Sequence, residues 1–118
     1  VAPGKAAPVV IRWRRTGQEP LDRPYKARVA LYDASEARVG QSDERLLNDR
    51  HLMPAEWLPD DTPLNVYSVP TSSDLSEGRY TLRLLVYDAD TLEALTRVDE
   101  AGNPAGQEAL LGEVEIRR

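Results

Sequence analysis

The chain has 118 residues, of which 41% are hydrophobic and 30% charged, and these values indicate one folded domain. Twenty acidic side chains outnumber fifteen basic ones, and the resulting net charge of −5 argues against binding to nucleic acid or to anionic membranes. The absence of cysteine excludes disulfides and thiolate metal sites. No apolar run approaches the roughly 20 residues that cross a bilayer, and no signal peptide opens the sequence, so we expect no direct membrane insertion.

The first eight residues, Val-Ala-Pro-Gly-Lys-Ala-Ala-Pro, have the composition of a linker. We therefore expect a linker over residues 1–8 and one β-sandwich domain over residues 9–118. We also expect the chain to be a piece of a longer protein.

Short segments of alternating apolar and polar residues, separated by turn residues, predict a succession of β-strands. They cover about residues 8–15, 25–33, 37–43, 64–69, 79–88, 94–98 and 110–117. Residues 44–63 hold three prolines and Trp57, and predict a long ordered loop that crosses between sheets, with a short helical turn near residues 43–48. Strands at this spacing, without a helical stripe, predict an all-β fold, an immunoglobulin-like antiparallel β-sandwich of about seven strands.

Two of these segments nearly repeat each other. Residues 25–34 read YKARVALYDA and residues 80–89 read YTLRLLVYDA, and five of the ten positions are identical. We predict that these strands form the centres of two packed sheets. Their alternation, with that of the first and last strands, predicts which side chains are buried. The predicted core is Trp13, Val29, Leu31, Leu82, Leu84, Val86, Val114 and Ile116, with Leu110 on the same face of the last strand.

Several motifs of the chain resemble those of a known class of proteins. They are Ile11-Arg-Trp13, Trp57-Leu-Pro59, Val69-Pro70, residues 79–93, residues 99–106 and residues 111–116. Together they resemble the C-terminal β-sandwich region of large bacterial membrane proteins of the dolichyl-phosphate-mannose mannosyltransferase-like class, found notably among Chloroflexi. The resemblance covers most of residues 9–116.

The resemblance implies a non-catalytic accessory or interaction domain outside the cytoplasm, associated with the cell envelope through its parent protein. In that class the transferase chemistry belongs to the membrane-embedded portion. The implied partner is therefore the remainder of the parent membrane protein, and no catalytic residue, metal or cofactor is implied for this chain.

Four aromatic residues suggest an alternative, a carbohydrate-binding module, because ring faces stack on the apolar faces of sugars. The candidates are Tyr32, Trp57, Tyr67 and Tyr87. Tyr32 and Tyr87 lie opposite the predicted core face at matching positions of the repeat, so we expect them to be exposed. For Trp57 a structural role is favoured, as a plug at the open edge of the sandwich. This alternative requires two or more of the rings to be exposed around a groove.

A second alternative is a fragment of a hydrolase or transferase. His51 is the only histidine, and no serine lies in a Gly-x-Ser-x-Gly motif. Such an enzyme would therefore need a deep pocket with convergent acidic side chains.

Turn residues rich in oxygen atoms could bind calcium or could cap the backbone of their own turns. They are Asp33, Asp88, Asp90, Asp99, Glu100 and Asn103. No Asp-x-Asp-x-Asp-Gly run is present, so turn capping is favoured and no metal is expected. Among the basic residues, Arg12 or Arg14 could lie beside Arg28 and attract an acidic group of a partner.

Overall fold

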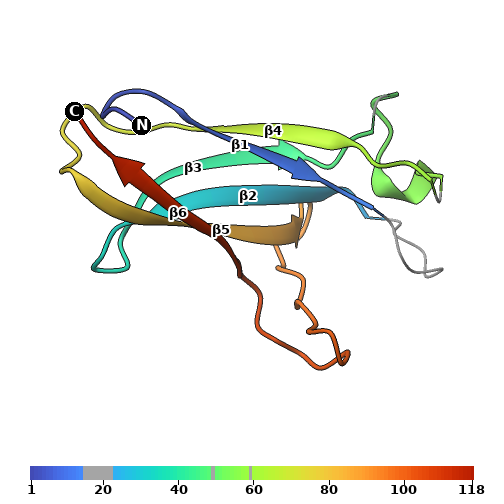
Figure 1. Ribbon diagram of the computed structural model, residues 1–118. Coiled ribbons are helices and arrows are strands. Elements are labelled where there is room, and N and C mark those ends of the chain that lie inside the picture. The colour runs from blue at the N-terminus through green and yellow to red at the C-terminus, as the bar shows by residue number, and fades with distance from the viewer. Residues whose placement is uncertain (15–22, 49, 59) are drawn as a thin grey trace.

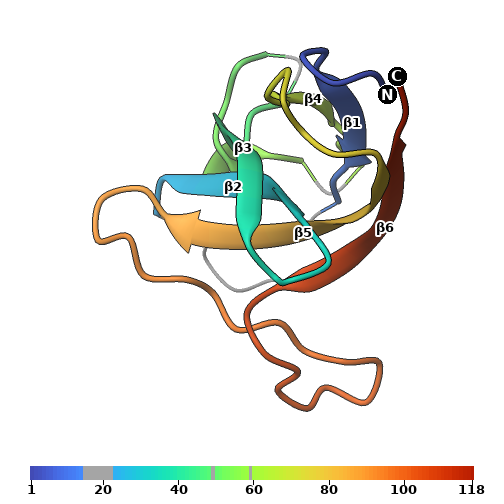
Figure 2. The same cartoon turned by 90° about the vertical axis from the view of Figure 1, so that its left-hand side faces the viewer.

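The computed structural model describes residues 1–14, 23–48, 50–58 and 60–118, which form two antiparallel sheets packed against each other (Figure 1). The smaller sheet pairs β1 (Ala7–Arg12) with β4 (Leu64–Val69). The larger sheet has the order β3 (Arg38–Arg45), β2 (Tyr25–Tyr32), β5 (Gly78–Asp88) and β6 (Ala109–Ile116) (Figure 2). The predicted all-β sandwich is confirmed, with six strands in the described residues.

The strand order is that of the immunoglobulin-like class. In chain order β1, β2, β3, β4, β5 and β6 occupy the places of strands B, C, C′, E, F and G, so that one sheet is B-E and the other C′-C-F-G. Strands A and D have no counterpart among the strands of the described residues. Tyr80, near the start of β5, donates a hydrogen bond from its hydroxyl to the carbonyl of Ser76 at 2.8 Å. This is the tyrosine corner that marks the start of strand F.

The two repeated segments are β2 and β5, and they are neighbours in the same sheet. They pair antiparallel from Tyr25 opposite Asp88 to Tyr32 opposite Thr81. The prediction that they form the centres of two different sheets is therefore wrong. Alternation shows which face of a strand is buried, but two strands of one sheet and two strands of facing sheets produce the same pattern.

The predicted core is largely confirmed. Four of the eight predicted side chains are buried in one apolar cluster, and the other four are partly buried against it. The buried four are Val29, Leu31, Leu82 and Ile116, and the partly buried four are Trp13, Leu84, Val86 and Val114.

Leu110 differs from the prediction because β6 contains a bulge. Gly112 lies opposite Leu82, but Leu110 lies opposite Arg83, so one extra residue separates the two parts of the strand. The extra residue reverses the facing of the side chains before it, and Leu110 is 70% exposed. Ala109 takes its place on the core face, opposite Leu84.

Three segments also differ from the sequence-based expectations. β1 already includes Ala7 and Pro8, and the Val1 amino group and carbonyl bond to Glu115 and Arg117, so described residues of the expected linker pack with the sandwich. Residues 94–98 form isolated bridges rather than a strand. The short helical turn is a 3₁₀ helix, η1 (Pro54–Glu56), and lies later than expected, because β3 extends to Arg45. The expected end of the first strand, residue 15, lies outside the described residues.

The two sheets approach each other closely where β3 passes the end of β4. A Cβ atom added to Gly40 would lie 2.3 Å from the carbonyl oxygen of Pro70. No heavy atom fits at that distance, so only glycine allows this approach without a shift of the backbone.

We predict that Gly40→Ala destabilises the protein by about 1–3 kcal/mol, because the methyl group forces β3 and β4 apart. This cost exceeds the gain of up to about 1 kcal/mol that alanine brings over glycine inside a strand. Chemical denaturation measures the difference, and Glu44→Ala, at an exposed position of the same strand, is the control. Equal stability of the Gly40 variant and the native chain would contradict the close approach.

Two buried tyrosines allow a matched comparison. Tyr80 donates its hydroxyl to Ser76, whereas the hydroxyl of Tyr67 is buried and has no hydrogen-bond partner among the described residues. We expect Tyr80→Phe to cost about 1 kcal/mol and Tyr67→Phe to leave the free energy of unfolding unchanged or to raise it. Thermal and urea unfolding test both. Similar losses for the two variants would show that the Tyr67 hydroxyl has an acceptor or donor in the folded protein.

Candidate functional site

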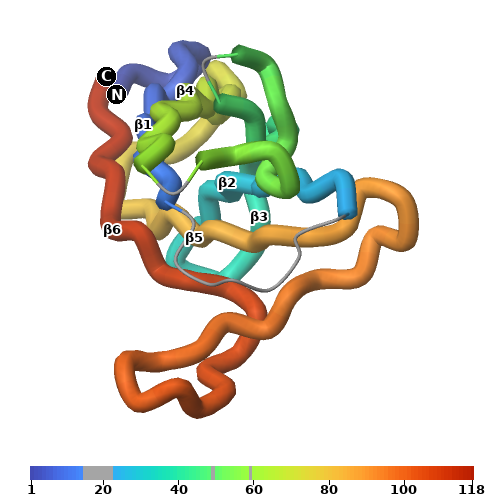
Figure 3. The backbone as a smooth tube through the Cα atoms, turned by 90° about the vertical axis from the view of Figure 1, so that its right-hand side faces the viewer, coloured from blue at the N-terminus to red at the C-terminus, as the bar shows by residue number. Residues whose placement is uncertain are grey.

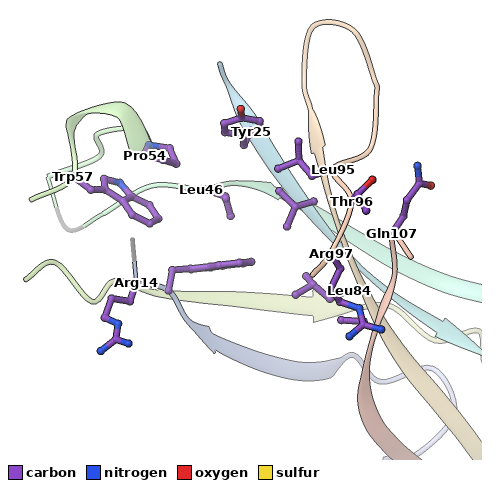
Figure 4. Close-up of a pocket in the computed structure, with 13 residues that line it drawn as sticks. Arg14, Tyr25, Leu46, Pro54, Trp57, Leu84, Leu95, Thr96, Arg97 and Gln107 are labelled. Carbon is purple, nitrogen blue, oxygen red and sulfur yellow. The ribbon is translucent and has the colours of Figure 1, made fainter. Parts of the chain in front are cut away.

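An apolar groove of about 330 Å³ opens between the two sheets at one end of the sandwich (Figure 4). Its interior is formed by aromatic and aliphatic side chains from both sheets and from the loop that joins them. They are Trp13, Tyr25, Leu46, Pro54, Trp57, Leu84, Val86, Leu95 and Ala109. Four polar residues, Arg14, Thr96, Arg97 and Gln107, complete the lining. The volume is at the lower end of the range for ligand pockets, so it suits a small ligand or one or two side chains.

One wall of the groove is the loop between β3 and β4, which Asn48 and Asp61 hold in place. The side chain of Asn48 accepts hydrogen bonds from the backbone of Arg50 and Leu52 and donates one to Asp61. Asp61 also accepts the backbone N–H of Leu58 at 2.8 Å, and this bond lowers the pKa of the carboxyl group. The loop thereby presents Trp57 to the interior, where the indole N–H donates to the carbonyl of Leu52 at 2.8 Å. Trp57 is 7% exposed, as expected of a side chain that plugs the edge of the sandwich.

The opposite wall comes from the long connection between β5 and β6, which extends away from the sheets in Figures 1 and 3. At its base the N–H of Leu95 donates to the carbonyl of Val86 at 2.8 Å. Arg97 binds across the connection, since its guanidinium donates to the carbonyls of Ala105 and Glu108 at 2.8 and 3.2 Å. These bonds hold Leu95, Thr96 and Arg97 beside the groove.

Asp88 anchors the same connection at the end of β5. Its carboxylate accepts the Arg23 guanidinium at 2.6 Å and the backbone N–H groups of Asp90 and Thr91. The hydrogen bond from Arg23 is the main cause that lowers the pKa of Asp88 to about 2, and the two backbone bonds act in the same direction. Asp88 is therefore ionised at neutral pH and fixes the start of the loop.

The charges around the groove differ in sign from the chain as a whole. Among the described lining residues two are arginines and none is acidic, although the net charge of the chain is −5. Arg14 is exposed and forms no ion pair with a described carboxylate. In Figure 4 Arg14 lies on the side of Trp57, whereas Arg97 lies near Leu84 and Gln107. The groove therefore combines an apolar interior with positive charge at two places on its rim.

The four aromatic residues proposed for sugar binding do not share a surface. Tyr67 is fully buried in the core, and this burial raises the pKa of its hydroxyl to about 12. Trp57 is buried in the groove wall. Neither Tyr67 nor Trp57 can therefore belong to an exposed platform, because both residues face the interior between the sheets.

Tyr32 and Tyr87 do lie on the face of the larger sheet that points away from the core. Tyr32 is nevertheless only 9% exposed, because the Arg83 guanidinium covers its ring at 4.3 Å and its hydroxyl bonds to Glu108. The Tyr87 hydroxyl donates to Asp43 at 2.7 Å, and burial together with this bond raises its pKa to about 12. Tyr32 pairs with Thr81 and Tyr87 with Lys26, so the two rings are about 20 Å apart along the strands.

His51 lies elsewhere, on the rim of a second hollow of about 320 Å³ between the loop and β4. Its neighbours there include one carboxylate, that of Glu44. Within the described residues no three His, Cys, Asp or Glu side chains are placed to hold a metal ion.

Three of the six residues considered for calcium cap their own turns. Asp33 accepts the N–H groups of Ser35 and Ala37, and Asp99 accepts those of Ala101 and Asn103. With Asp88, which caps its turn in the same way, they account for the acidic turns by local hydrogen bonding.

Sequence reasoning missed most of the groove. Trp13, Leu84 and Val86 were identified as core residues, but not as the wall of a hollow that solvent reaches. Arg97 and Leu95 had no distinguishing pattern, because their positions depend on where a long loop leaves the sheet. The one available signal was that both tryptophans of the chain lie in segments that end a strand or follow one.

Comparisons with protein-family models, with curated proteins and with solved structures find no match for this chain. No helix in the described part of the chain has the length and hydrophobicity needed to cross a bilayer.

The pKa of Asp88 predicts how stability depends on pH. Because its folded-state pKa is about 2 and its unfolded value is about 3.9, the carboxylate stabilises the fold above about pH 4, and this contribution is lost as the pH falls towards 2. Asp88→Asn should therefore be less stable than the native chain at neutral pH and equal to it near pH 2. Urea unfolding from pH 2 to 7 tests this. The control is Asp90→Asn, whose exposed carboxylate lies 3.7 Å from Arg23, and a constant difference for Asp88→Asn would contradict the prediction.

Proposed function

We propose that the chain is a non-catalytic interaction domain of a larger, membrane-anchored protein and binds a partner through the groove. The observation that carries this proposal is the concave apolar surface with Trp13, Tyr25 and Trp57 in its lining. Aromatic side chains in a pocket that excludes water are the usual centres of protein interfaces. The groove holds no described carboxylate that could act as a general acid or base.

The position of the groove also supports an accessory role. Val1 bonds to Glu115 and Arg117 at the end of β6, so the two chain ends lie together (Figure 2). The groove is at the opposite end of the strands, beside the start of β2 and of β6. A parent protein attached at the chain ends would therefore hold the groove away from the attachment point.

The wider assignment rests on the sequence resemblance. We propose that the parent is a glycosyltransferase-like protein of the bacterial cell envelope and that the domain lies outside the cytoplasm. The full coding sequence tests this part: adjoining multi-helix membrane segments support it, whereas an adjoining secreted catalytic domain contradicts it and favours carbohydrate binding.

Carbohydrate binding and hydrolysis have less support from the geometry. Sugar recognition needs several hydrogen-bonding groups beside an exposed ring, and the interior of the groove is apolar. Hydrolysis needs acidic groups that converge in a pocket, and His51 and Glu44 lie at the separate second hollow.

Binding in the groove can be measured directly, because the only two tryptophans of the chain, Trp13 and Trp57, both line it. We predict that a peptide with two adjacent leucines, such as acetyl-Asn-Leu-Leu-Asn-amide or its Asp-flanked form, changes tryptophan fluorescence. The amide NMR signals of Leu84 and Val86 should shift with it. Leu95→Gln should weaken binding, because this side chain lines the groove, and Leu92→Gln on the same loop, 72% exposed and outside the lining, should not.

Failure of both leucine peptides to shift these signals would overturn the proposed groove function. Shifts caused instead by mannotetraose or cellotetraose, mapped to Tyr32 or Tyr87, would establish the carbohydrate-binding alternative. Turnover of a glycoside or ester that is lost in His51→Ala would contradict the non-catalytic assignment.

A further inference from the structure

The rim of the groove indicates the chemistry of its occupant. The lining combines nine mainly apolar residues with two arginines, and the described part of it includes no acid. This local excess of positive charge is notable because acidic residues outnumber basic ones by twenty to fifteen in the chain. A random sample of the surface would favour acidic over basic side chains at the rim.

The two arginines differ in what they can offer a ligand. The Arg97 guanidinium already donates two hydrogen bonds to backbone carbonyls, which fix its position while its charge remains uncompensated by a described carboxylate. Arg14 directly follows Trp13 in the sequence and is exposed. It has no hydrogen bond or ion pair with a described residue. A planar guanidinium in this state matches a carboxylate with two parallel hydrogen bonds.

The size of the groove decides between a peptide and a longer apolar chain. About 330 Å³ accommodates one or two side chains, but not a lipid tail or an oligosaccharide along its whole length. One or two side chains of a protein partner fit within this volume, because they enter the groove as anchors while the rest of the partner stays outside.

Resting on the proposed groove function, we propose that the groove binds a segment of a protein partner in which aliphatic or aromatic anchor residues are flanked by acidic ones. The anchor side chains pack between Trp13, Trp57 and Leu84, and a flanking carboxylate pairs with Arg14. Arg97 adds attraction at the other side of the opening. The positive rim thus selects among apolar segments, and the apolar interior provides the contact area.

Three peptides test separately whether binding needs the apolar anchors and whether it needs the flanking acidic residues. They are acetyl-Asp-Leu-Leu-Asp-amide, its neutral form with Asn in place of Asp, and acetyl-Asp-Ser-Ser-Asp-amide. Tryptophan fluorescence and NMR shifts of Leu84 and Val86 report binding. We expect the acidic leucine peptide to bind about five-fold or more tightly than the neutral one at low salt, since two exposed ion pairs each contribute about two- to five-fold. The advantage should shrink in 0.5 M NaCl, and the serine peptide should not bind.

Arg14→Gln should weaken binding of the acidic peptide about two- to five-fold and leave the neutral peptide unchanged. Arg14→Lys should restore part of the difference, because it keeps the charge but not the two parallel hydrogen bonds of a guanidinium. Arg12→Gln is the matched control, since Arg12 is also exposed and lies two residues away but does not line the groove. Arg12 and Arg14 both lie at exposed positions, so we expect all three variants to fold.

Equal affinities for the acidic and neutral leucine peptides, or equal effects of Arg14→Gln and Arg12→Gln, would overturn the acidic-partner inference and leave the groove function intact. Binding of the serine peptide as tightly as the leucine peptide would also overturn it, because the anchor would then be unnecessary. If neither leucine peptide binds, both proposals are overturned.

Discussion

The antiparallel pairing of β2 with β5 is the constraint on which the rest of the structure depends. Val29 lies opposite Leu84 and Leu31 opposite Leu82, so the apolar halves of two alternating strands form one continuous face. That face is where the smaller sheet packs, through Tyr67 and Val69 of β4 and the core-facing residues of β1. A slip of one residue in this pairing would turn the apolar side chains of one of the two strands to the opposite face. The same pairing places the Tyr-Asp-Ala turns at opposite ends of the sheet, where Asp33 and Asp88 each cap a loop.

Local patterns predicted much of this arrangement because they act within a few residues. The alternation in residues 25–32 and 79–88, the turn-forming acids and the ordered loop around Trp57 could all be read from neighbouring side chains. The features that the sequence did not reveal depend on contacts between distant segments. Nothing near Leu110 shows that β6 contains a bulge, because the shift exists only relative to β5. Likewise, the residues next to Tyr67 in the sequence are typical of a half-exposed strand. Tyr67 is buried because the other sheet covers it.

The groove follows from an unequal match between the sheets. The larger sheet has four strands and the smaller one two in the described residues, so the smaller sheet leaves part of the larger sheet's apolar face uncovered. Leu84 and Val86 lie in this part, and for this reason they are only partly buried. The loop from β3 to β4 lines one side with Pro54 and Trp57, and the base of the connection from β5 to β6 lines the other side with Leu95 and Arg97. The structural core and part of the lining of the groove are thus formed by the same strands.

The adjacency of the two chain ends has a topological consequence. Val1 bonds to Glu115 and Arg117, so the polypeptide enters and leaves the sandwich at nearly the same place. A domain of this kind can be inserted into a surface loop of another protein without separating the two sides of that loop. The host fold then needs no rearrangement to carry it, and copies can be gained or lost as whole units. Circular permutation, with the old ends joined by a short peptide and new ends opened in the β5–β6 connection, should for the same reason preserve the paired strands.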